Sequence, residues 1–97
     1  MINFLKTRAH IFISGRVQGV FFRETAKKKA DRFGVSGWVK NLKDGRVEAV
    51  LEGDEEKVGS LVKWAKRGPF FAKVNNLEFF KEDYKGEFSS FEIRYDL

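Results

Sequence analysis

Two glycines, an apolar segment and an arginine follow one another in the run Gly15-Arg16-Val17-Gln18-Gly19-Val20-Phe21-Phe22-Arg23. A short turn bracketed by glycines lets the backbone come close to a ligand and turn several N–H groups into one concavity, which is a binding site for anions. Arg23 adds a planar guanidinium whose donors suit a phosphate group. The spacing therefore predicts a loop that binds phosphate.

The same loop precedes a predicted helix. Apolar residues recur at helical spacing over residues 22–33, and Gly34 is a typical helix stop. No Ser, Thr, Asp or Asn lies between Gly15 and the helix to accept from its first N–H groups, so these donors need water or an external acceptor. The alternative is that the glycines only shape a turn, that Gly19 caps the helix and that Arg23 is a solvated surface residue.

The elements that must position this loop are predicted from periodicity and turn signals. Alternation and helical spacing indicate strands at residues 8–14, 35–41, 46–52 and 74–81, a second helix after the N-cap Asp54 that stops at residues 66–69, and a short last strand with Phe91, Ile93 and Tyr95. This order predicts an α+β, ferredoxin-like βαββαβ sandwich with an antiparallel sheet, two helices on one face and a short terminal strand. We expect one domain over residues 1–97, with residues 1–7 as a loosely ordered N-terminal segment.

The amino-acid composition excludes several kinds of catalytic and metal site. The 97 residues contain no Cys and one His, which argues against a disulfide framework, a zinc site or a Ser-His-Asp triad. We therefore expect no metal and no cofactor. The sequence contains no apolar stretch of membrane-spanning length and no signal-peptide pattern, so we expect a cytoplasmic protein without a membrane partner, and nothing in the sequence suggests more than a monomer.

The net charge of +5 favours anionic partners without choosing among them. A non-enzymatic RNA-binding module on the same fold is the main rival, and the lysines at positions 27, 28 and 29 resemble a nucleic-acid patch. The predicted strand at residues 46–52 lacks the stacking aromatics of an RNA recognition motif. We therefore expect no nucleic-acid partner, and we interpret the lysines and the alternating Glu48 and Glu52 as solvated surface charge.

The loop run becomes specific together with two further segments, Gly37-Trp38-Val39-Lys40-Asn41 and Asp44-Gly45-Arg46-Val47-Glu48. Together these runs closely resemble the two signature segments of the acylphosphatase family, and they occur in the same order. The resemblance covers about residues 8–95. Two departures are visible. Family members often have two prolines after the second helix, where Pro69 is followed here by two phenylalanines, and some have a hydroxyl residue at the position of Leu42.

The resemblance implies a ferredoxin-like fold and an enzyme that hydrolyses the carboxyl–phosphate bond of small acyl phosphates. It implies two catalytic residues, Arg23 on the phosphoryl oxygens and Asn41 on the attacking water. It also implies that the phosphate is bound by backbone amides of the loop, namely those of Arg16, Val17, Gln18, Gly19, Val20 and Phe21. On the residues alone, Asn41 is a turn-initiating residue that bonds its own backbone; with the loop motif, the catalytic role is favoured.

Overall fold

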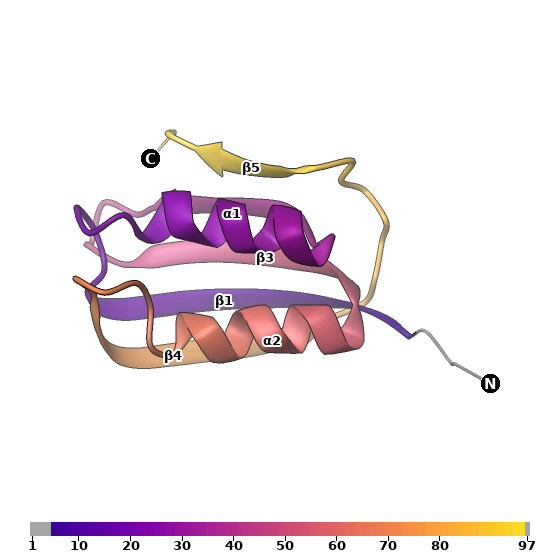
Figure 1. The fold of residues 1–97 in the computed structure, drawn as a ribbon, viewed down its shortest axis with the longest axis horizontal. Coiled ribbons are helices and arrows are strands. Elements are labelled where there is room, and N and C mark those ends of the chain that lie inside the picture. Colours follow the sequence, from indigo (N-terminus) through magenta and orange to yellow (C-terminus); the bar gives the residue numbers. More distant parts are fainter. Residues whose placement is uncertain (1–4, 97) are drawn as a thin grey trace.

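The computed structural model describes residues 5–96 as an alternation of strands and helices in the predicted order. The elements are β1 (Lys6–Arg16), α1 (Phe22–Phe33), β2 (Ser36–Asn41), β3 (Val47–Asp54), α2 (Glu55–Ala65), β4 (Lys73–Glu82) and β5 (Phe91–Arg94). Both helices lie on one face of the sheet, as Figure 1 shows. No helix in the described part of the chain is long and apolar enough to span a membrane.

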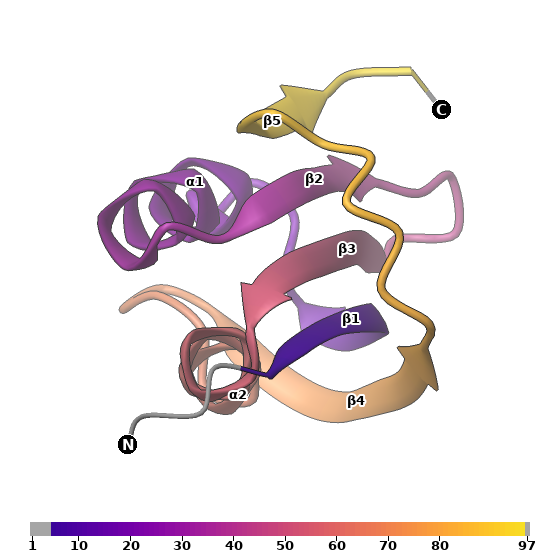
Figure 2. The same ribbon diagram turned by 90° about the vertical axis from the view of Figure 1, so that its right-hand side faces the viewer.

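The strands form one sheet in the order β4-β1-β3-β2-β5. β1 is antiparallel to β3 and to β4, and β2 is antiparallel to β3, whereas β5 runs parallel to β2. The ferredoxin-like prediction is confirmed, but the sheet is mixed and not purely antiparallel. The reason is the connection over residues 83–90, which passes the other strands before the chain enters beside β2 (Figure 2).

β1 extends beyond the predicted strand at both ends. Lys6 pairs with Asp54 and Thr7 with Gly53, so these two residues belong to the sheet and correct the expectation of a loose segment over residues 1–7. Residues 1–4 lie outside the described residues. The sequence predicted a shorter strand because the prediction followed the alternation of apolar and polar side chains. Backbone pairing continues to Lys6 and Arg16 without that alternation.

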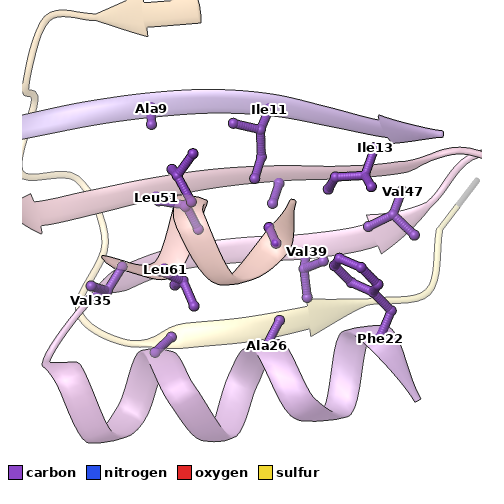
Figure 3. Packing of buried hydrophobic residues seen from close by; sticks show 14 of the residues in the cluster. Ala9, Ile11, Ile13, Phe22, Ala26, Val35, Val39, Val47, Leu51 and Leu61 are labelled. Atoms are coloured by element: carbon purple, nitrogen blue, oxygen red, sulfur yellow. The ribbon is translucent and has the colours of Figure 1, made fainter. Parts of the chain in front are cut away.

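The hydrophobic core fills the space between the sheet and the two helices. Ile11 and Ile13 of β1, Leu51 of β3, Phe22 of α1 and Leu61 of α2 are at most 3% exposed, and Figure 3 shows them pointing into this layer. Burial of each such side chain contributes about 1.5–3 kcal/mol. Because Phe22 is the first residue of α1, this packing also holds the helix start, and the loop before it, against the sheet.

The opposite face of the sheet is less solvated than expected. Glu52, interpreted above as a surface charge, is 0% exposed. Its carboxylate accepts from the backbone N–H groups of Lys85, Gly86 and Glu87 at 2.7–3.2 Å, and Arg8 pairs with it at 3.4 Å. The β4–β5 connection therefore covers this face by wrapping its backbone donors around one carboxylate, which alternation along β3 alone cannot reveal.

Acidification is expected to destabilise the protein through this carboxylate. Burial by itself raises the pKa of Glu52, but the three backbone donors and Arg8 outweigh burial and lower the pKa below its ordinary value. The pKa of Glu82 is also lowered, chiefly because Arg8 and then His10 hydrogen-bond to it. Depressed carboxyl pKa values stabilise the fold above the unfolded-state pKa of about 4.3, and this contribution is lost as the pH falls through the lower, folded-state values.

Urea unfolding at fixed temperature between pH 7 and pH 3 measures this effect. We expect the free energy of unfolding to be nearly flat from pH 7 to about pH 5 and to fall steeply below about pH 4.3. Replacement of Glu52 by Gln removes one titrating group and is expected to flatten the acid limb. An acid limb with the same slope in the variant would contradict the assignment of the effect to this residue.

Candidate active site

The two predicted catalytic residues lie near the ends of β1 and β2, at the same edge of the sheet. β1 and β2 are both antiparallel to β3, which lies between them, so they are parallel to each other and end together. The loop that leaves β1 and the turn that leaves β2 therefore meet at one edge, on the left in Figure 1, where α1 also begins. Asn41 ends β2 and Arg23 lies in the first turn of α1.

The loop backbone alternates in the sign of φ over residues 19–21, which is the kind of alternation that forms an anion nest. Gly19 and Phe21 have positive φ angles of 74° and 65°, and Val20 between them does not. Alternation of left-handed and ordinary residues turns successive N–H groups toward one concavity. α1 begins at Phe22 after Phe21, which provides no side-chain cap, as expected from the missing cap residue. The helix N-cap is thus Phe21 and not Gly19, so the alternative that Gly19 caps the helix is wrong.

The two loop glycines have different roles. A Cβ on Gly15 would lie 2.2 Å from the backbone oxygen of Lys73, so Gly15 permits close approach of β1 to β4 and not of a ligand. A Cβ on Gly19 would meet nothing within 4 Å, so only its left-handed backbone requires glycine there.

Gln18 fastens the loop to the β2–β3 hairpin. Its Nε2 donates to the carbonyl oxygens of Leu42 and Arg46 at 2.8 and 2.9 Å. The same two residues close the hairpin, because Leu42 N–H donates to the Arg46 carbonyl at 2.8 Å. The loop and the residue before Leu42, Asn41, are therefore held in a fixed relation by one side chain.

A hollow of about 130 Å³ opens between these elements. This is the volume of about four water molecules, and it is well below that of a pocket for a large ligand. Of the predicted site residues, Val17, Gly19, Phe21, Arg23 and Asn41 line it. The three remaining loop residues, Arg16, Gln18 and Val20, are not among its lining residues.

Arg23 lines the hollow and is not held in an ion pair with any described residue. Among the described residues its guanidinium has no partner in an ion pair, and it lies over the ring of Tyr95 with 5.1 Å to the ring centroid. An aromatic face holds a guanidinium without neutralising it or occupying its in-plane donors. Arg23 thus presents a full positive charge to an anion in the hollow.

Asn41 has a buried side-chain oxygen without a hydrogen-bond partner. Its Oδ1 atom is buried, and no hydrogen-bond donor of the described residues reaches it. A buried acceptor without a partner costs about 1–3 kcal/mol, so such atoms are rare in structural roles. The earlier alternative, an Asn that bonds its own backbone, leaves this acceptor unexplained.

Comparison with known proteins identifies the family. The family model described as acylphosphatase matches residues 9–93. The chain belongs to the acylphosphatase family. It is 55% identical over 87 residues to the acylphosphatase of Pyrobaculum calidifontis, a match that covers 89% of this chain and 79% of that relative. The prediction of a hydrolase of this family is confirmed.

Two solved acylphosphatase structures have the same fold as this chain. The one from Bacillus subtilis is 38% identical with a TM-score of 0.87, and the match covers 92% of this chain and 99% of that one. The one from Coxiella burnetii is 40% identical with a TM-score of 0.86, and it covers 92% and 93% of the two chains.

Three further residues belong to the surroundings of the candidate site and were not predicted from the sequence. Phe22 and Glu24 line the hollow, and Tyr95 supports Arg23. The position of Glu24 in the first turn of α1 could be predicted from the sequence, but the sequence suggested no role for this residue. Tyr95 could not be found locally, because its position depends on the parallel pairing of β5 with β2.

The lysine run that suggested nucleic acid is partly engaged inside the fold. Lys27 donates to the Phe91 carbonyl at 2.9 Å and pairs with Asp31 at 3.1 Å, and Lys29 lies over the Trp64 ring. Asp31 therefore compensates the charge of Lys27, whereas the ring of Trp64 leaves the charge of Lys29 unneutralised. The absence of a nucleic-acid partner remains an expectation.

Proposed function

We propose that this chain hydrolyses acyl phosphates at the phosphorus atom, with the phosphoryl group in the hollow before α1. The observation that carries the proposal is that residues of the loop, Arg23 and Asn41 line one small hollow, and that the Oδ1 of Asn41 has no partner among the described residues. Donors for an anion and an acceptor for a water proton are the two requirements of a phosphoryl hydrolysis site.

The anion-binding groups bind and position the phosphoryl group. Backbone N–H groups of residues 16–21 and the fork of Arg23 donate to its non-bridging oxygens. In a loose phosphoryl-transfer transition state most of the protein's contribution is positioning and stabilisation of charge on the equatorial oxygens. Because the loop is fixed by Gln18 and the Phe22 packing, the donors are already oriented before the substrate arrives.

Asn41 orients the nucleophile. A water that donates one hydrogen to Oδ1 keeps a lone pair free for phosphorus. The new bond forms between the water oxygen and phosphorus, and the bond between phosphorus and the acyl oxygen breaks. The electron pair leaves on the carboxylate, and the water protons go to the inorganic phosphate and to solvent. A carboxylate is a good leaving group, which reduces the need for a general acid.

We infer that the protein acts as a monomer, because the residues proposed to bind the phosphoryl group and the water all belong to one chain and need no partner subunit. The lack of cysteine is compatible with a cytoplasmic location.

The activity is tested directly by following loss of acetyl phosphate in the presence of the purified protein. We expect saturable hydrolysis to acetate and inorganic phosphate, with inorganic phosphate as a competitive inhibitor. Absence of hydrolysis of acetyl phosphate and of any other acyl phosphate would overturn the proposal.

Gln18→Ala is expected to lower kcat/KM for acetyl phosphate by about 10-fold, because a displacement of the loop relative to Asn41 misplaces reacting groups. Gln18→Glu keeps the side-chain length but lacks the amide donor, so it is expected to show the same loss. Steady-state kinetics on the two variants measure the effect. Wild-type kinetics in both would show that the two hydrogen bonds do not align the site.

A further inference from the structure

The turn between α2 and β4, which can be followed in Figure 1, projects two phenylalanine rings into solvent. Phe70 is 92% exposed and Phe71 is 62% exposed, although rings of this kind are normally buried in a core or an interface. The two rings contact each other edge to face, with 5.1 Å between their centroids, and neither belongs to the hydrophobic core. Folding of this chain therefore leaves a pair of apolar rings largely in water.

A closed turn holds these rings outward. The Ala72 N–H donates to the Pro69 carbonyl at 3.0 Å, so Phe70 and Phe71 occupy the two central positions of a four-residue turn. Gly68, which precedes the turn, is buried, so the turn is anchored to the body of the protein at its start. The exposure of the rings is thus a property of a hydrogen-bonded turn and not of a loose loop.

The surroundings of the two rings are positively charged. Residues 57–77 contain no Asp or Glu, and their five basic residues are Lys57, Lys63, Lys66, Arg67 and Lys73. Lys66, Arg67 and Lys73 flank the turn in the chain, and all three are exposed. None of these three is in an ion pair with another described residue. Their charges are therefore available to an external anion.

A hollow beside Phe70 brings one of these cations next to the rings. Its volume is about 430 Å³. It is lined by Trp64, Arg67, Gly68, Pro69, Phe70 and Ala72. The lining thus combines aromatic rings with one guanidinium and contains no carboxylate. Because a guanidinium binds phosphate through two parallel hydrogen bonds, a group that carries phosphate fits the chemistry of this hollow.

A partner for this surface must be apolar in its interior and negative on its outside. A bilayer with anionic lipids has both properties: its surface potential attracts Lys and Arg, and aromatic rings enter the boundary between head groups and acyl chains. A fluid bilayer also needs no pocket shaped to a protruding pair of rings. Single-stranded nucleic acid is less suited, because the neighbouring ring of Trp64 already contacts Lys29 and Phe22 and is not free to stack on a base.

We propose that this chain docks on membranes that contain anionic lipids, through the turn of residues 69–72. Phe70 and Phe71 insert among the lipids, and Lys66, Arg67 and Lys73 lie at the level of the negatively charged head groups. The contact lies on the bilayer surface and does not span it. It revises the expectation of a protein without a membrane partner, and it does not depend on the proposed hydrolysis.

Co-sedimentation with vesicles tests the docking. The vesicles contain either phosphatidylcholine alone or phosphatidylcholine with about 30% phosphatidylserine. We expect the wild type to bind the vesicles with phosphatidylserine at low salt and to be released by about 0.5 M salt. We expect it to bind the neutral vesicles at least ~10-fold more weakly, because they offer no anion to the cations around the turn.

Replacement of both rings, by Phe70→Ala with Phe71→Ala, is expected to lower the partition coefficient on phosphatidylserine vesicles at least ~10-fold, because the inserted apolar surface is lost. Tyr84→Ala is the matched control, since Tyr84 is 46% exposed and lies beyond the opposite end of β4. The control should bind like the wild type. Circular dichroism and thermal unfolding show whether both proteins are folded.

Charge reversal by Lys66→Glu with Arg67→Glu is also expected to lower the partition coefficient at least ~10-fold. Lys28→Glu with Arg32→Glu is the matched control, because it changes the net charge by the same amount at exposed positions of α1. It should change binding by no more than about threefold. A comparable loss in both double variants would show that net charge, and not this surface, attracts the protein, and would overturn the proposal.

Insertion of the turn has its own readout. Since the chain has no cysteine, Phe70→Cys provides a single position for an environment-sensitive dye. We expect its emission to shift to the blue on phosphatidylserine vesicles and to be quenched by brominated lipids. A dye at Tyr84→Cys should show neither effect. Unchanged emission of the dye at Phe70→Cys would overturn the insertion of the turn.

Three results of the vesicle assay would overturn the proposal as a whole: no binding to anionic vesicles at low salt, equal binding to neutral and anionic vesicles, and equal binding of the wild type and the ring variant. An oligothymidylate that binds more tightly than the vesicles, and equally well to the ring variant, would assign the surface to nucleic acid instead. Each of these results leaves the proposed hydrolysis standing, because no residue of the turn lines its hollow.

Discussion

Arg23→Ala is expected to lower kcat/KM for acetyl phosphate by at least ~10²-fold, as removal of one oriented transition-state donor commonly does. The guanidinium is the charged donor that lines the hollow, and its charge is not neutralised by an acid within the described residues. The fold should persist, because the contact of Arg23 with Tyr95 lies on an exposed ring and contributes about 0.5–1 kcal/mol. Steady-state kinetics and thermal unfolding measure the two effects.

Asn41→Ala tests the second half of the same prediction. We expect kcat to fall by at least ~10²-fold, while the inhibition constant of inorganic phosphate changes by no more than about twofold, because in the proposed mechanism Asn41 acts on water and not on phosphate. Arg23→Ala, in contrast, should weaken phosphate inhibition.

Matched controls for the two catalytic variants are Arg32→Ala at the exposed end of α1 and Asn76→Ala on β4, which should retain wild-type kinetics. Near-full activity in both Arg23→Ala and Asn41→Ala would defeat the assignment.

Glu52→Ala is expected to destabilise the protein by about 3–5 kcal/mol, the usual cost of removing one partner from a buried charged network. The variant leaves the three backbone N–H groups without their acceptor and removes one of the three carboxylates that Arg8 contacts, the other two being Glu82 and Glu87. A domain of this size has about 5–15 kcal/mol in total, so the midpoint of thermal unfolding should fall by at least ~10 °C. Urea and thermal unfolding at pH 7 measure the change.

Glu48→Ala is the matched control, because Glu48 lies on the same strand and on the same face of β3 as Glu52. It contacts His10 at 2.6 Å, and its side chain is partly accessible to solvent. Its loss should cost no more than about 1 kcal/mol. Well below its unfolding temperature, Glu52→Ala should keep wild-type kcat, because Glu52 does not line the hollow. Equal stability of the two variants would contradict the structural role given to Glu52.

Local patterns in the sequence predicted the elements and the location of the site. The glycine spacing, the uncapped start of α1 and the Asp54 cap of α2 are local features, and the structure shows each of them, with Asp54 accepting from Glu56 N–H at 3.1 Å. The edge shared by Arg23 and Asn41 follows from strand order alone. Such features depend either on residues close in the sequence or on the order of the strands, and both can be predicted from one sequence.

Features that depend on distant segments could not be predicted in this way. Alternation along β3 correctly separated its two faces, but the burial of Glu52 depends on backbone donors more than 30 residues later in the chain. The support of Arg23 by Tyr95 depends on the parallel entry of β5. The unpartnered Oδ1 of Asn41 is a property of side-chain packing, and no spacing of residue types reports it.

Titration of the 15N-labelled protein with inorganic phosphate, followed through its backbone amide resonances, tests the central claim most directly. The account predicts one saturable site, with the largest shifts at the amides of residues 16–22 and at the side chain of Arg23, and with these shifts weakened in Arg23→Ala. Shifts that gather elsewhere on the surface, or none at phosphate concentrations that inhibit hydrolysis, would contradict it.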